Sequence, residues 1–281
     1  MKTFQHPDDF RSLDSADFSP RVIVPTMGAL HEGHLALITR ARQLAGESGC
    51  VIVSIFVNPT QFDRTDDLVN YPRTMECDLA LCEEHGVDVV YAPSPEAMYL
   101  SGHSITVTEV SLSKQLCGAT RPGHFDGVCT VVLKLFNLTK SDISVFGKKD
   151  FQQLAVIRRM ARDLNVPTIV EGVETVREES GLALSSRNLR LSPAEKHDAA
   201  RIRASLVAAR DACDAGETCA EKLLTISKDG IESSEQGARI DYLELLDADT
   251  LSPVENIATP CVLATAVFYG KVRLIDNIEL G

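Results

Sequence analysis

Two histidines three residues apart, His31 and His34, are the first residues whose spacing suggests chemistry. They follow a short apolar run at residues 21–25 and precede a stretch, 33–45, whose apolar residues recur at helical spacing. The loop between a strand and the next helix is where a doubly wound sheet binds phosphates, beside the helix N-terminus. Imidazoles placed there can donate hydrogen bonds to a phosphate that gains charge in a transition state. The alternative is a pair of solvent-exposed or helix-capping histidines.

Gly33 lies between these histidines, and its lack of a Cβ removes an obstacle to a nucleotide. Two histidines at this spacing would need a third ligand to hold a metal ion, and the neighbouring sequence offers none. We therefore expect a phosphate site here and no metal held by the protein.

Two uncharged amides, Asn58 and Gln61, follow a second apolar run at residues 50–57. That run is continuous and rich in β-branched residues, as in strands buried on both faces of a parallel sheet. We expect both amides at the carboxyl edge of the sheet, where they suit a hydroxyl or a carboxylate. Because Asn-Pro is also a common turn signal, they can instead be turn residues.

Cationic residues occur in two further loops. Arg121 and His124 lie in a segment rich in Gly and Pro, residues 118–127, that allows close approach of a ligand to the backbone. Lys148 and Lys149 join an apolar strand to a helix. Positive charge at a helix N-terminus is unfavourable without an anion, so an anionic ligand is implied. Asp150 and Gln153 next to them suit either a capping box or ligand contact.

A third polar loop carries Ser185, Ser186 and Arg187 within residues 177–187. Two hydroxyls and a guanidinium in succession can bind a polyphosphate. Because the pattern of elements changes after this loop, we expect a polar hinge there and a clamp that closes on the ligand.

The composition excludes several classes of protein. The chain has 281 residues, 44% hydrophobic residues, 28 Lys and Arg and 40 Asp and Glu, for a net charge of −12. Disorder is excluded, and a nucleic-acid partner is not expected because the charge repels a phosphate backbone. The sequence has neither an apolar leader nor a membrane-length apolar run, so we expect no membrane partner. The 8 cysteines include no C-x-x-C pair and are expected to be reduced and mostly buried, so we predict a cytoplasmic protein.

The order of the predicted elements indicates an α/β fold. Apolar strands alternate with helical stretches as far as about residue 170, which predicts a doubly wound parallel sheet. At Ser192, Pro193 and Glu195 a strong helix start opens a different unit of two helices followed by three strands. We predict a Rossmann-like catalytic domain over residues 1–178 and a smaller α+β domain over residues 179–281.

Taken together, these motifs resemble the pantothenate synthetase (pantoate–β-alanine ligase) family of the H-x-G-H nucleotidyltransferase superfamily. H-x-G-H alone is typical of the superfamily, whereas the ordered set is specific to the family. The matching blocks are residues 25–34, 56–59, 61–62, 71–74, 121–125, 149–153, 181–183 and 185–188.

The resemblance implies the condensation of (R)-pantoate with β-alanine, at the expense of ATP, through an enzyme-bound pantoyl adenylate. It also implies Mg²⁺ on the ATP phosphates, a homodimer, and a C-terminal domain that acts as a lid. The residues that match catalytic positions are His31, His34, Lys149, Ser185, Ser186 and Arg187. Those that match ATP-binding positions are Pro25, Thr26, Met27, Gly28, His31, His34, Phe146, Gly147, Lys148, Lys149, Asp150, Leu184, Ser185, Ser186 and Arg187. Those that match substrate positions are Met27, Asn58, Gln61, Phe62, Tyr71, Arg121 and Gln153.

Three positions depart from the family pattern. Thr60 replaces a usual Met, Lys148 a common Glu, and Ser180 a usual Asp. None of the three removes a residue with an expected role in the chemistry, but Thr60 lies in the expected pantoate region.

Other functions fit the H-x-G-H turn. A nucleotidylyltransferase would transfer AMP or CMP to a phosphorylated acceptor and would need a site for that phosphate. An aminoacyl-tRNA synthetase would need an RNA-binding appendage, and the short acidic chain shows none. A non-catalytic adenylate sensor could dispense with His31, His34 or Lys149, and all three are present. The full set of motifs favours the ligase.

Overall fold

The computed structural model describes residues 1–13, 19–62 and 68–281. It contains two compact units. Unit 1 comprises Met1–Lys148 and Gln153–Glu174, and unit 2 comprises Lys149–Gln152 and Thr175–Gly281. The short segment Lys149–Gln152 is therefore separated in sequence from the rest of unit 2, an arrangement that the sequence pattern did not indicate.

Unit 1 is built on a parallel sheet whose strands lie in the order β1-β4-β3-β2-β5-β6. The strands are β1 (Lys2–Phe4), β2 (Arg21–Thr26), β3 (Cys50–Ile55), β4 (Val89–Tyr91), β5 (Ile143–Gly147) and β6 (Ile169–Val173). The central strand β2 pairs with β3 on one side and β5 on the other. The predicted doubly wound sheet is confirmed, although β1 has no counterpart among the predicted strands.

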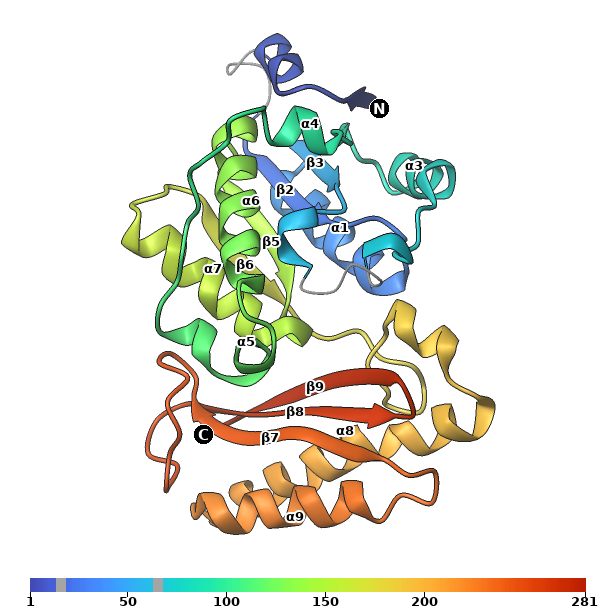
Figure 1. The fold of residues 1–281 in the computed structure, drawn as a ribbon, viewed down its shortest axis with the longest axis vertical. Helices are drawn as coiled ribbons and strands as arrows, with labels where there is room; N and C mark the ends of the chain where they lie inside the picture. Colours follow the sequence, from blue (N-terminus) through green and yellow to red (C-terminus); the bar gives the residue numbers. More distant parts are fainter. Residues whose placement is uncertain (14–18, 63–67) are drawn as a thin grey trace. The chain divides into compact units, whose positions relative to one another are not determined.

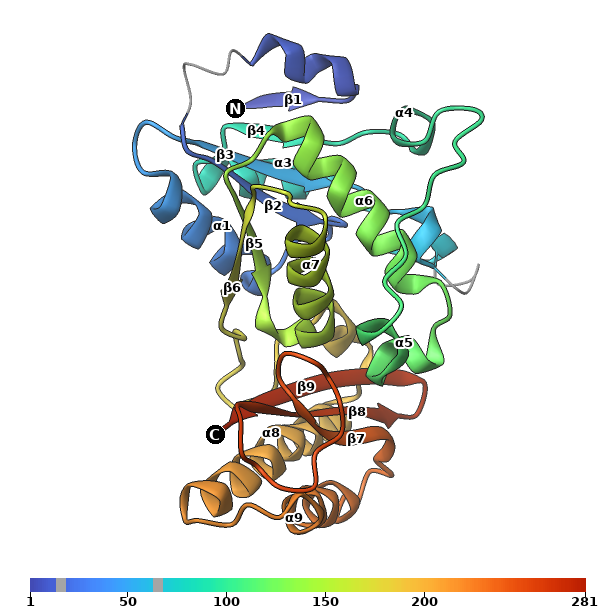
Figure 2. The same cartoon turned by 90° about the vertical axis from the view of Figure 1, so that its left-hand side faces the viewer.

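Helices cover both faces of this sheet, with α1 on the opposite side from α6 and α7 (Figure 2). The α-helices are α1 (Glu32–Ala45), α3 (Met75–Glu84), α4 (Pro95–Met98), α5 (Leu116–Thr120), α6 (His124–Thr139) and α7 (Phe151–Asp163). Short 3₁₀ turns are η1 (Pro7–Ser12), η2 (Pro59–Gln61), η3 (Leu112–Lys114) and η4 (Lys148–Asp150). Both η2 and η4 begin shortly after the carboxyl end of a strand, where the polar motifs were expected.

The core beneath α1 is made of aliphatic side chains from β2 and β3. Val22, Val24, Val51 and Val53 are fully buried and pack with Ile38 of α1. Burial of each such side chain stabilises the fold by about 1.5 to 3 kcal/mol. All six residues of β3 are buried, as expected for a strand covered on both faces. This core fixes the strand ends from which the polar loops leave.

Unit 2 is an antiparallel sheet in the order β7-β8-β9, covered on one face by two helices (Figure 1). The elements are η5 (Ser186–Arg190), α8 (Pro193–Asp214), α9 (Ala220–Glu232), β7 (Arg239–Asp247), β8 (Cys261–Tyr269) and β9 (Val272–Leu280). The predicted helix start is confirmed, because Glu195 N donates to Ser192 Oγ at 3.3 Å and Ser192 N to Glu195 Oε2 at 2.8 Å. Leu206, Leu223 and Leu263 join α8, α9 and β8 in one apolar core.

The segment expected to be a polar hinge is ordered within unit 2. Leu184 N donates to Val176 O at 3.0 Å, which closes a turn over residues 176–184. The Arg177 guanidinium donates to both carboxylate oxygens of Asp276 in β9, at 2.7 and 2.9 Å. Asp276 is only 4% exposed, so this bidentate pair fastens the turn to the sheet.

The cysteines are all free, as expected, but their burial varies. Cys50, Cys82, Cys129 and Cys261 are buried, whereas Cys77 is exposed. Burial raises the pKa of the Cys50 thiol to about 11 and that of Cys129 to about 12, so both stay protonated and unreactive at neutral pH. Within the described part of the chain, no helix is both long enough and apolar enough to span a bilayer.

Candidate functional site

His31 and His34 cap the helix that they open. His31 Nδ1 accepts a hydrogen bond from Gly33 N at 3.1 Å, and His34 Nδ1 accepts one from His31 N at 3.3 Å. A neutral imidazole that accepts at Nδ1 carries its hydrogen on Nε2. The capping role and the chemical role are therefore compatible, because capping at Nδ1 fixes each ring in the tautomer whose Nε2–H donates. The two rings lie 4.2 Å apart between centroids.

Gly33 has a structural purpose that the sequence did not indicate. A Cβ at this position would lie 2.9 Å from Cε1 and 3.1 Å from Nδ1 of His31. The His31 ring itself therefore needs this space to reach the helix backbone, and the expectation that Gly33 also makes room for a nucleotide stays a prediction.

Asp78, which sequence reasoning missed, anchors the loop before these histidines. Its carboxylate accepts from Ala29 N at 2.9 Å and from Leu30 N at 2.8 Å, and the residue is 2% exposed. Gly28 and Ala29 both have positive φ, +80° and +50°, which turns these N–H groups toward the carboxylate. A Cβ at Gly28 would lie 3.0 Å from Asp78 Oδ2, so glycine is needed for both conformation and space.

The strand end before this loop is held by Thr26. Its Oγ1 donates to Ser54 O at 2.7 Å and accepts from Gly28 N at 3.2 Å. Pro25 and Met27 on either side of it are partly buried. This part of the predicted ATP-binding set thus forms one continuous turn from β2 to α1.

Asn58 and Gln61 lie together on and before η2, and both are buried, at 1% and 9% exposure. Asn58 Nδ2 donates to Gln61 Oε1 at 3.2 Å and to Gly127 O at 3.1 Å. Its Oδ1 accepts from Tyr99 OH at 2.8 Å and from Thr60 Oγ1 at 3.0 Å. The Asn58 amide is therefore occupied by protein groups, whereas the Nε2 of Gln61 donates to a weak acceptor, Met27 Sδ, at 3.0 Å.

Arg121 and His124 reach the same point from the start of α6. His124 Nδ1 lies 2.8 Å from Gln61 O, which can only accept, so Nδ1 carries the hydrogen. Arg121 Nη1 lies 3.3 Å from His124 Nε2, and its Nη2 donates to Gln61 O at 3.4 Å. The backbones approach closely, because a Cβ on Gly127 would lie 2.6 Å from the Thr60 carbonyl. These hydrogen bonds join residues 60 and 63 positions apart in the sequence, so two separate motifs meet in unit 1.

Phe62 and Tyr71 also meet, with ring centroids 5.7 Å apart in a T-shaped contact. The nearby Arg73 donates to backbone oxygens of Val69 and Tyr71 at 3.3 and 3.2 Å. Arg73 is exposed, and these hydrogen bonds lie within its own turn.

The two lysines at the end of β5 have different partners. Lys148 Nζ lies 2.6 Å from Glu174 Oε1, so a carboxylate of the protein already supplies an anion beside it. The charge of Lys148 is therefore offset within the protein, and its predicted contact with an anionic ligand stays a prediction. Lys149 Nζ donates to Leu184 O at 3.0 Å, within unit 2. Phe146 is buried, Gly147 is partly buried and Asp150 is exposed.

Lys149 has a perturbed ammonium group. Desolvation lowers its pKa, and the positive charges of Arg187 and Arg177 lower it further, against the opposing effect of Asp150 and Asp276. Asn277 Nδ2 also donates to Lys149 O at 2.9 Å, which fixes the backbone. An ammonium group that has a lowered pKa and is held at a carbonyl oxygen is a candidate for binding a phosphate, because an anion would stabilise its charged form.

Ser185 and Arg187 lie at the start of η5 in unit 2. Ser185 Oγ accepts from Arg187 N at 3.2 Å and so caps this turn. Arg187 is exposed, whereas Leu184 and Ser186 are partly buried. Unit 2 therefore brings together Lys149, Leu184 and the residues of the serine loop. Gln153, in the first turn of α7, belongs to unit 1 and is partly buried.

No group of three or more His, Cys, Asp or Glu in the described ranges could hold a metal ion. Mg²⁺ is commonly held by substrate phosphates with one or two carboxylates and several waters, rather than by a cage of protein ligands. The donor set is thus compatible with Mg²⁺ that is carried by ATP.

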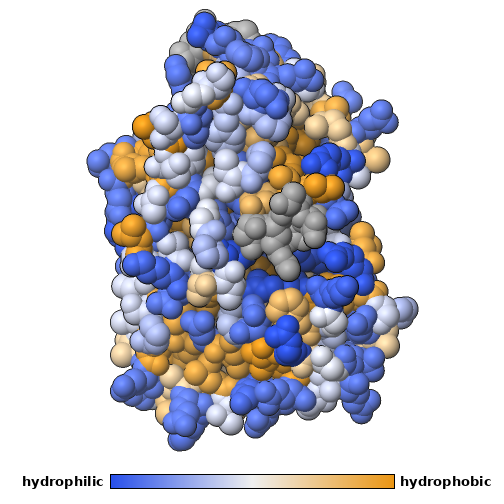
Figure 3. Space-filling model, in the orientation of Figure 1, coloured by the Kyte–Doolittle hydropathy of each residue, from blue (hydrophilic) through white to orange (hydrophobic). Residues whose placement is uncertain are grey.

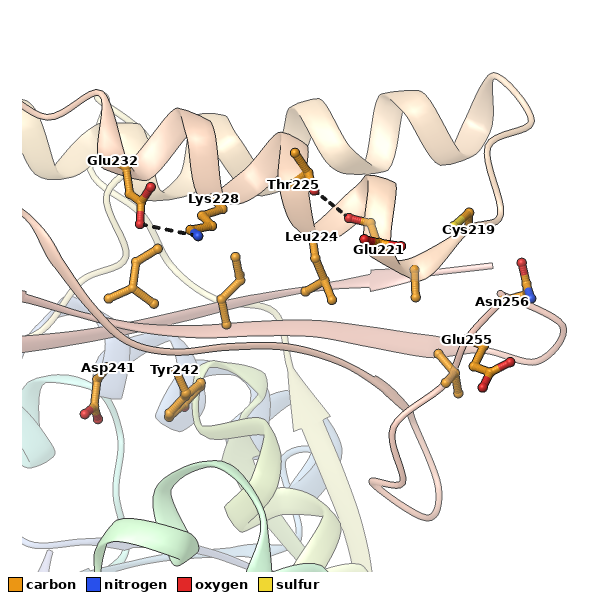
Figure 4. Close-up of a pocket in the computed structure, with 14 residues that line it drawn as sticks. Cys219, Glu221, Leu224, Thr225, Lys228, Glu232, Asp241, Tyr242, Glu255 and Asn256 are labelled. Atoms are coloured by element: carbon orange, nitrogen blue, oxygen red, sulfur yellow. Dashed lines mark hydrogen bonds and ion pairs between the residues drawn. The ribbon is translucent and has the colours of Figure 1, made fainter.

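An open groove in unit 2 is a poor candidate for the same ligands. It lies between α9 and β7, with apolar residues Leu224, Leu243 and Val254 in its lining, and apolar surface is visible in this area (Figure 3). Four carboxylates also line it, from Glu221, Glu232, Asp241 and Glu255, against the single lysine Lys228. In Figure 4, Lys228 is paired with Glu232, at 3.9 Å. This lining would repel anionic ligands such as ATP or a hydroxy acid.

The sequence as a whole matches one protein family. The sequence model of the pantoate-β-alanine ligase family covers residues 2–279. The chain belongs to the pantoate-β-alanine ligase family. Among curated relatives of this ligase family, pantothenate synthetase from Akkermansia muciniphila is 56% identical over 92% of each chain. That from Syntrophotalea carbinolica is 48% identical over 95% of this chain and 93% of the relative.

Solved structures of the ligase family agree with this family assignment. Pantothenate synthetase from Thermus thermophilus superposes with a TM-score of 0.92 at 42% identity, covering 99% of both chains. Pantoate-β-alanine ligase from Francisella tularensis, solved in complex with β-γ ATP and β-alanine, gives a TM-score of 0.79 at 33% identity over 99% of this chain and 97% of that chain. The family assignment and the α/β architecture predicted from the motifs are confirmed.

Proposed function

We propose that the chain catalyses the ATP-dependent condensation of (R)-pantoate with β-alanine, giving pantothenate, AMP and pyrophosphate through a pantoyl adenylate. The observation that carries this proposal is the match of one ligase family to residues 2–279. The complex of the Francisella tularensis relative with β-γ ATP and β-alanine supports two of the three substrates.

In the first step, a pantoate carboxylate oxygen attacks the α-phosphorus of ATP, and the bond to pyrophosphate breaks. The protein needs to align the nucleophile and stabilise charge on the phosphates, and it forms no covalent bond itself. We assign the phosphate contacts to the Nε2–H groups of His31 and His34 and to Lys149, Ser185, Ser186 and Arg187. Mg²⁺ on the phosphates would neutralise part of the charge on the departing pyrophosphate.

We assign pantoate binding to Gln61 and Gln153, with Met27, Phe62, Tyr71 and Arg121 around them. The capped imidazoles support the phosphate assignment, because a donor fixed before the ligand arrives needs no reorganisation in the transition state. The amide of Asn58 is occupied by protein groups, so we assign to Asn58 the orientation of Gln61 and not direct contact with pantoate.

In the second step, the neutral amine of β-alanine attacks the acyl carbonyl of the adenylate, and AMP leaves with the electron pair of the broken bond. The amine loses a proton as the amide forms. A general base is not required for attack by an amine that is already neutral. The protein's task in this step is to hold the adenylate and to keep water from it.

Cytoplasmic location and a homodimer belong to the same proposal. The free cysteines agree with a reducing compartment. The dimer stays a prediction from the resemblance, and light scattering of the purified protein checks it.

The experiment that tests the reaction is product analysis with one component omitted at a time. With MgATP, pantoate and β-alanine, we expect equal amounts of AMP, pyrophosphate and pantothenate. Sustained pyrophosphate release with pantoate alone, unaffected by β-alanine, would indicate a different acceptor and contradict the ligase. Absence of turnover in every mixture would also contradict it.

A further inference from the structure

The orientation of the Asn58 amide is fixed by backbone groups whose roles are unambiguous. Gly127 O can only accept, so the atom 3.1 Å from it must be the amide nitrogen Nδ2. Thr60 N can only donate, and it lies 3.4 Å from the other atom, which must be Oδ1. Asn58 is 1% exposed, so its amide has no solvent with which to exchange these partners.

The fixed Asn58 amide sets the orientation of Gln61. Because Nδ2 of Asn58 donates, its second partner, 3.2 Å away, must be the oxygen Oε1 of Gln61. The nitrogen Nε2 of Gln61 then occupies the other end, 3.0 Å from Met27 Sδ. A thioether sulfur is a weak acceptor. A carboxylate or hydroxyl oxygen in the same direction would be a stronger acceptor for the Gln61 N–H groups.

Two hydroxyl groups hold the oxygen end of the Asn58 amide. Tyr99 OH donates to Asn58 Oδ1 at 2.8 Å, and Thr60 Oγ1 does so at 3.0 Å. The two hydroxyls also lie 3.3 Å from each other. The Tyr99 ring is fixed by Phe56, with centroids 6.3 Å apart, and by His103, with centroids 4.9 Å apart. Burial raises the pKa of Tyr99, so its hydroxyl keeps the hydrogen that it donates.

We propose that Tyr99 and Thr60 are positioning residues that act through Asn58 to fix the Gln61 amide with its nitrogen toward an acceptor oxygen of the hydroxy-acid substrate. The order of donation runs from the two hydroxyls to Asn58 Oδ1, from Asn58 Nδ2 to Gln61 Oε1, and from Gln61 Nε2 to the substrate. The inference rests on the proposed function, in which Gln61 binds pantoate. Neither hydroxyl needs to touch the substrate.

The test uses Tyr99→Phe, Thr60→Val and the double variant, because each substitution removes a hydroxyl with little change of shape. Loss of one net hydrogen bond changes a binding constant roughly 2- to 12-fold. We expect Tyr99→Phe to raise the KM for pantoate by such a factor, and the double variant to raise it further. The kcat and the KM values for ATP and β-alanine should stay within about twofold of the unmodified protein.

Tyr91→Phe is the matched control, because Tyr91 OH is buried with no hydrogen-bond partner among the described residues. Its kinetics should equal those of the unmodified protein. Thermal unfolding of every variant separates a loss of fold from a loss of pantoate binding.

A double-mutant cycle with Gln61→Ala distinguishes positioning from a general structural effect. If Tyr99 acts through Gln61, Tyr99→Phe should have no further effect on the pantoate KM in the Gln61→Ala background. Equal effects in both backgrounds, or an unchanged pantoate KM in the Tyr99→Phe/Thr60→Val variant, would overturn the inference while leaving the ligase activity in place. Absence of any pantoate dependence in the unmodified protein would instead overturn the proposed function together with the inference.

Discussion

The candidate residues of unit 1 and unit 2 are held in different ways. In unit 1, each imidazole is bound through Nδ1, and Gln61 is bound through Oε1, so the opposite end of each group is oriented for donation. In unit 2, the Lys149 ammonium itself donates to Leu184 O at 3.0 Å. The atom that would bind phosphate in unit 2 is therefore also the atom that holds the loop.

This difference separates two ways of building a polar site. The groups of unit 1 are preorganised, because a hydrogen bond at one end of each group fixes the direction of the other end before a ligand arrives. Lys149 must give up or share its carbonyl partner to bind an anion, so part of its binding energy is offset by the lost hydrogen bond. Substitutions of the unit 1 histidines should therefore affect mainly kcat, whereas those in unit 2 should also affect ATP binding and its dependence on pH.

The largest effect is expected for His34. Removal of one preorganised donor lowers kcat roughly 10²- to 10³-fold. In His34→Asn, the amide oxygen can replace Nδ1 as the helix cap but offers no donor at the Nε2 position, so we expect the full loss of kcat with a nearly unchanged melting temperature. His34→Ala should lose the same activity and also about 1 kcal/mol of stability. Near-normal turnover of His34→Asn, measured by pyrophosphate release, would remove Nε2 from the mechanism.

Lys149 should give the next largest effect, with a distinctive pH dependence. Its lowered pKa means that the ammonium loses its proton at a lower pH than an ordinary lysine. Because only the charged form binds phosphate well, the rate of pyrophosphate release with pantoate alone should fall as pH rises through that pKa. Lys149→Ala should lose roughly 10²-fold at neutral pH.

Lys149→Arg tests the origin of this alkaline decline, since a guanidinium stays protonated. The decline should move to higher pH or disappear in this variant, whatever its maximal rate. Lys228→Arg, on the groove between α9 and β7, is the matched control and should leave the profile unchanged. An identical decline in Lys149→Arg would show that another group titrates. Omission of β-alanine prevents the titration of its own amine from contributing.

Asp78→Asn should have an intermediate effect. An amide in this place offers one acceptor where the loop presents two donors, so Ala29 N or Leu30 N loses its partner. A buried unsatisfied donor costs about 1 to 3 kcal/mol. We expect that loss of unfolding free energy in urea titrations, with a roughly tenfold lower kcat as the histidine loop loosens. Asp229→Asn, an exposed carboxylate on α9, controls for the change of charge. Normal values for Asp78→Asn would show that Asp78 does not anchor the loop.

The smallest effect is expected for Ser185, where capping and ligand binding can be separated. Ser185→Ala should cost about 0.5 to 1 kcal/mol of stability and raise the KM for ATP, whereas Ser185→Asn keeps a capping oxygen. We expect Ser185→Asn to recover the melting temperature but not the ATP KM. Recovery of both would indicate that Ser185 has only a structural role.

The sequence predicted the elements whose apolar pattern is strong. The runs that form β2 and β3 are fully or nearly fully buried, so their composition reveals them. Strand β1 has three residues and buries only Phe4, which leaves no pattern to detect. The position of Lys149–Gln152 in unit 2 depends on contacts such as Asn277 to Lys149 O, 128 residues apart, and no local pattern reports these.

The candidate site was predictable where polar residues follow apolar strands. His31, Asn58 and Lys149 all have that position, and the match to the family motifs then assigns each of them an expected role. Asp78 and Tyr99 were missed because they lie on or after helices, where a polar residue looks like any surface residue. Their partners are 48, 49 and 41 residues away, so only the folded chain reveals their roles.

A single-turnover experiment tests the central claim most directly. Enzyme in excess over ATP is mixed with pantoate, and samples are quenched at intervals. A parallel sample is chased with β-alanine. We predict one equivalent of pyrophosphate and one of pantoyl adenylate before the chase, and complete conversion of the adenylate to pantothenate and AMP after it. Pyrophosphate that appears only once β-alanine is present, or an adenylate that the chase does not convert, would contradict the two-step ligase.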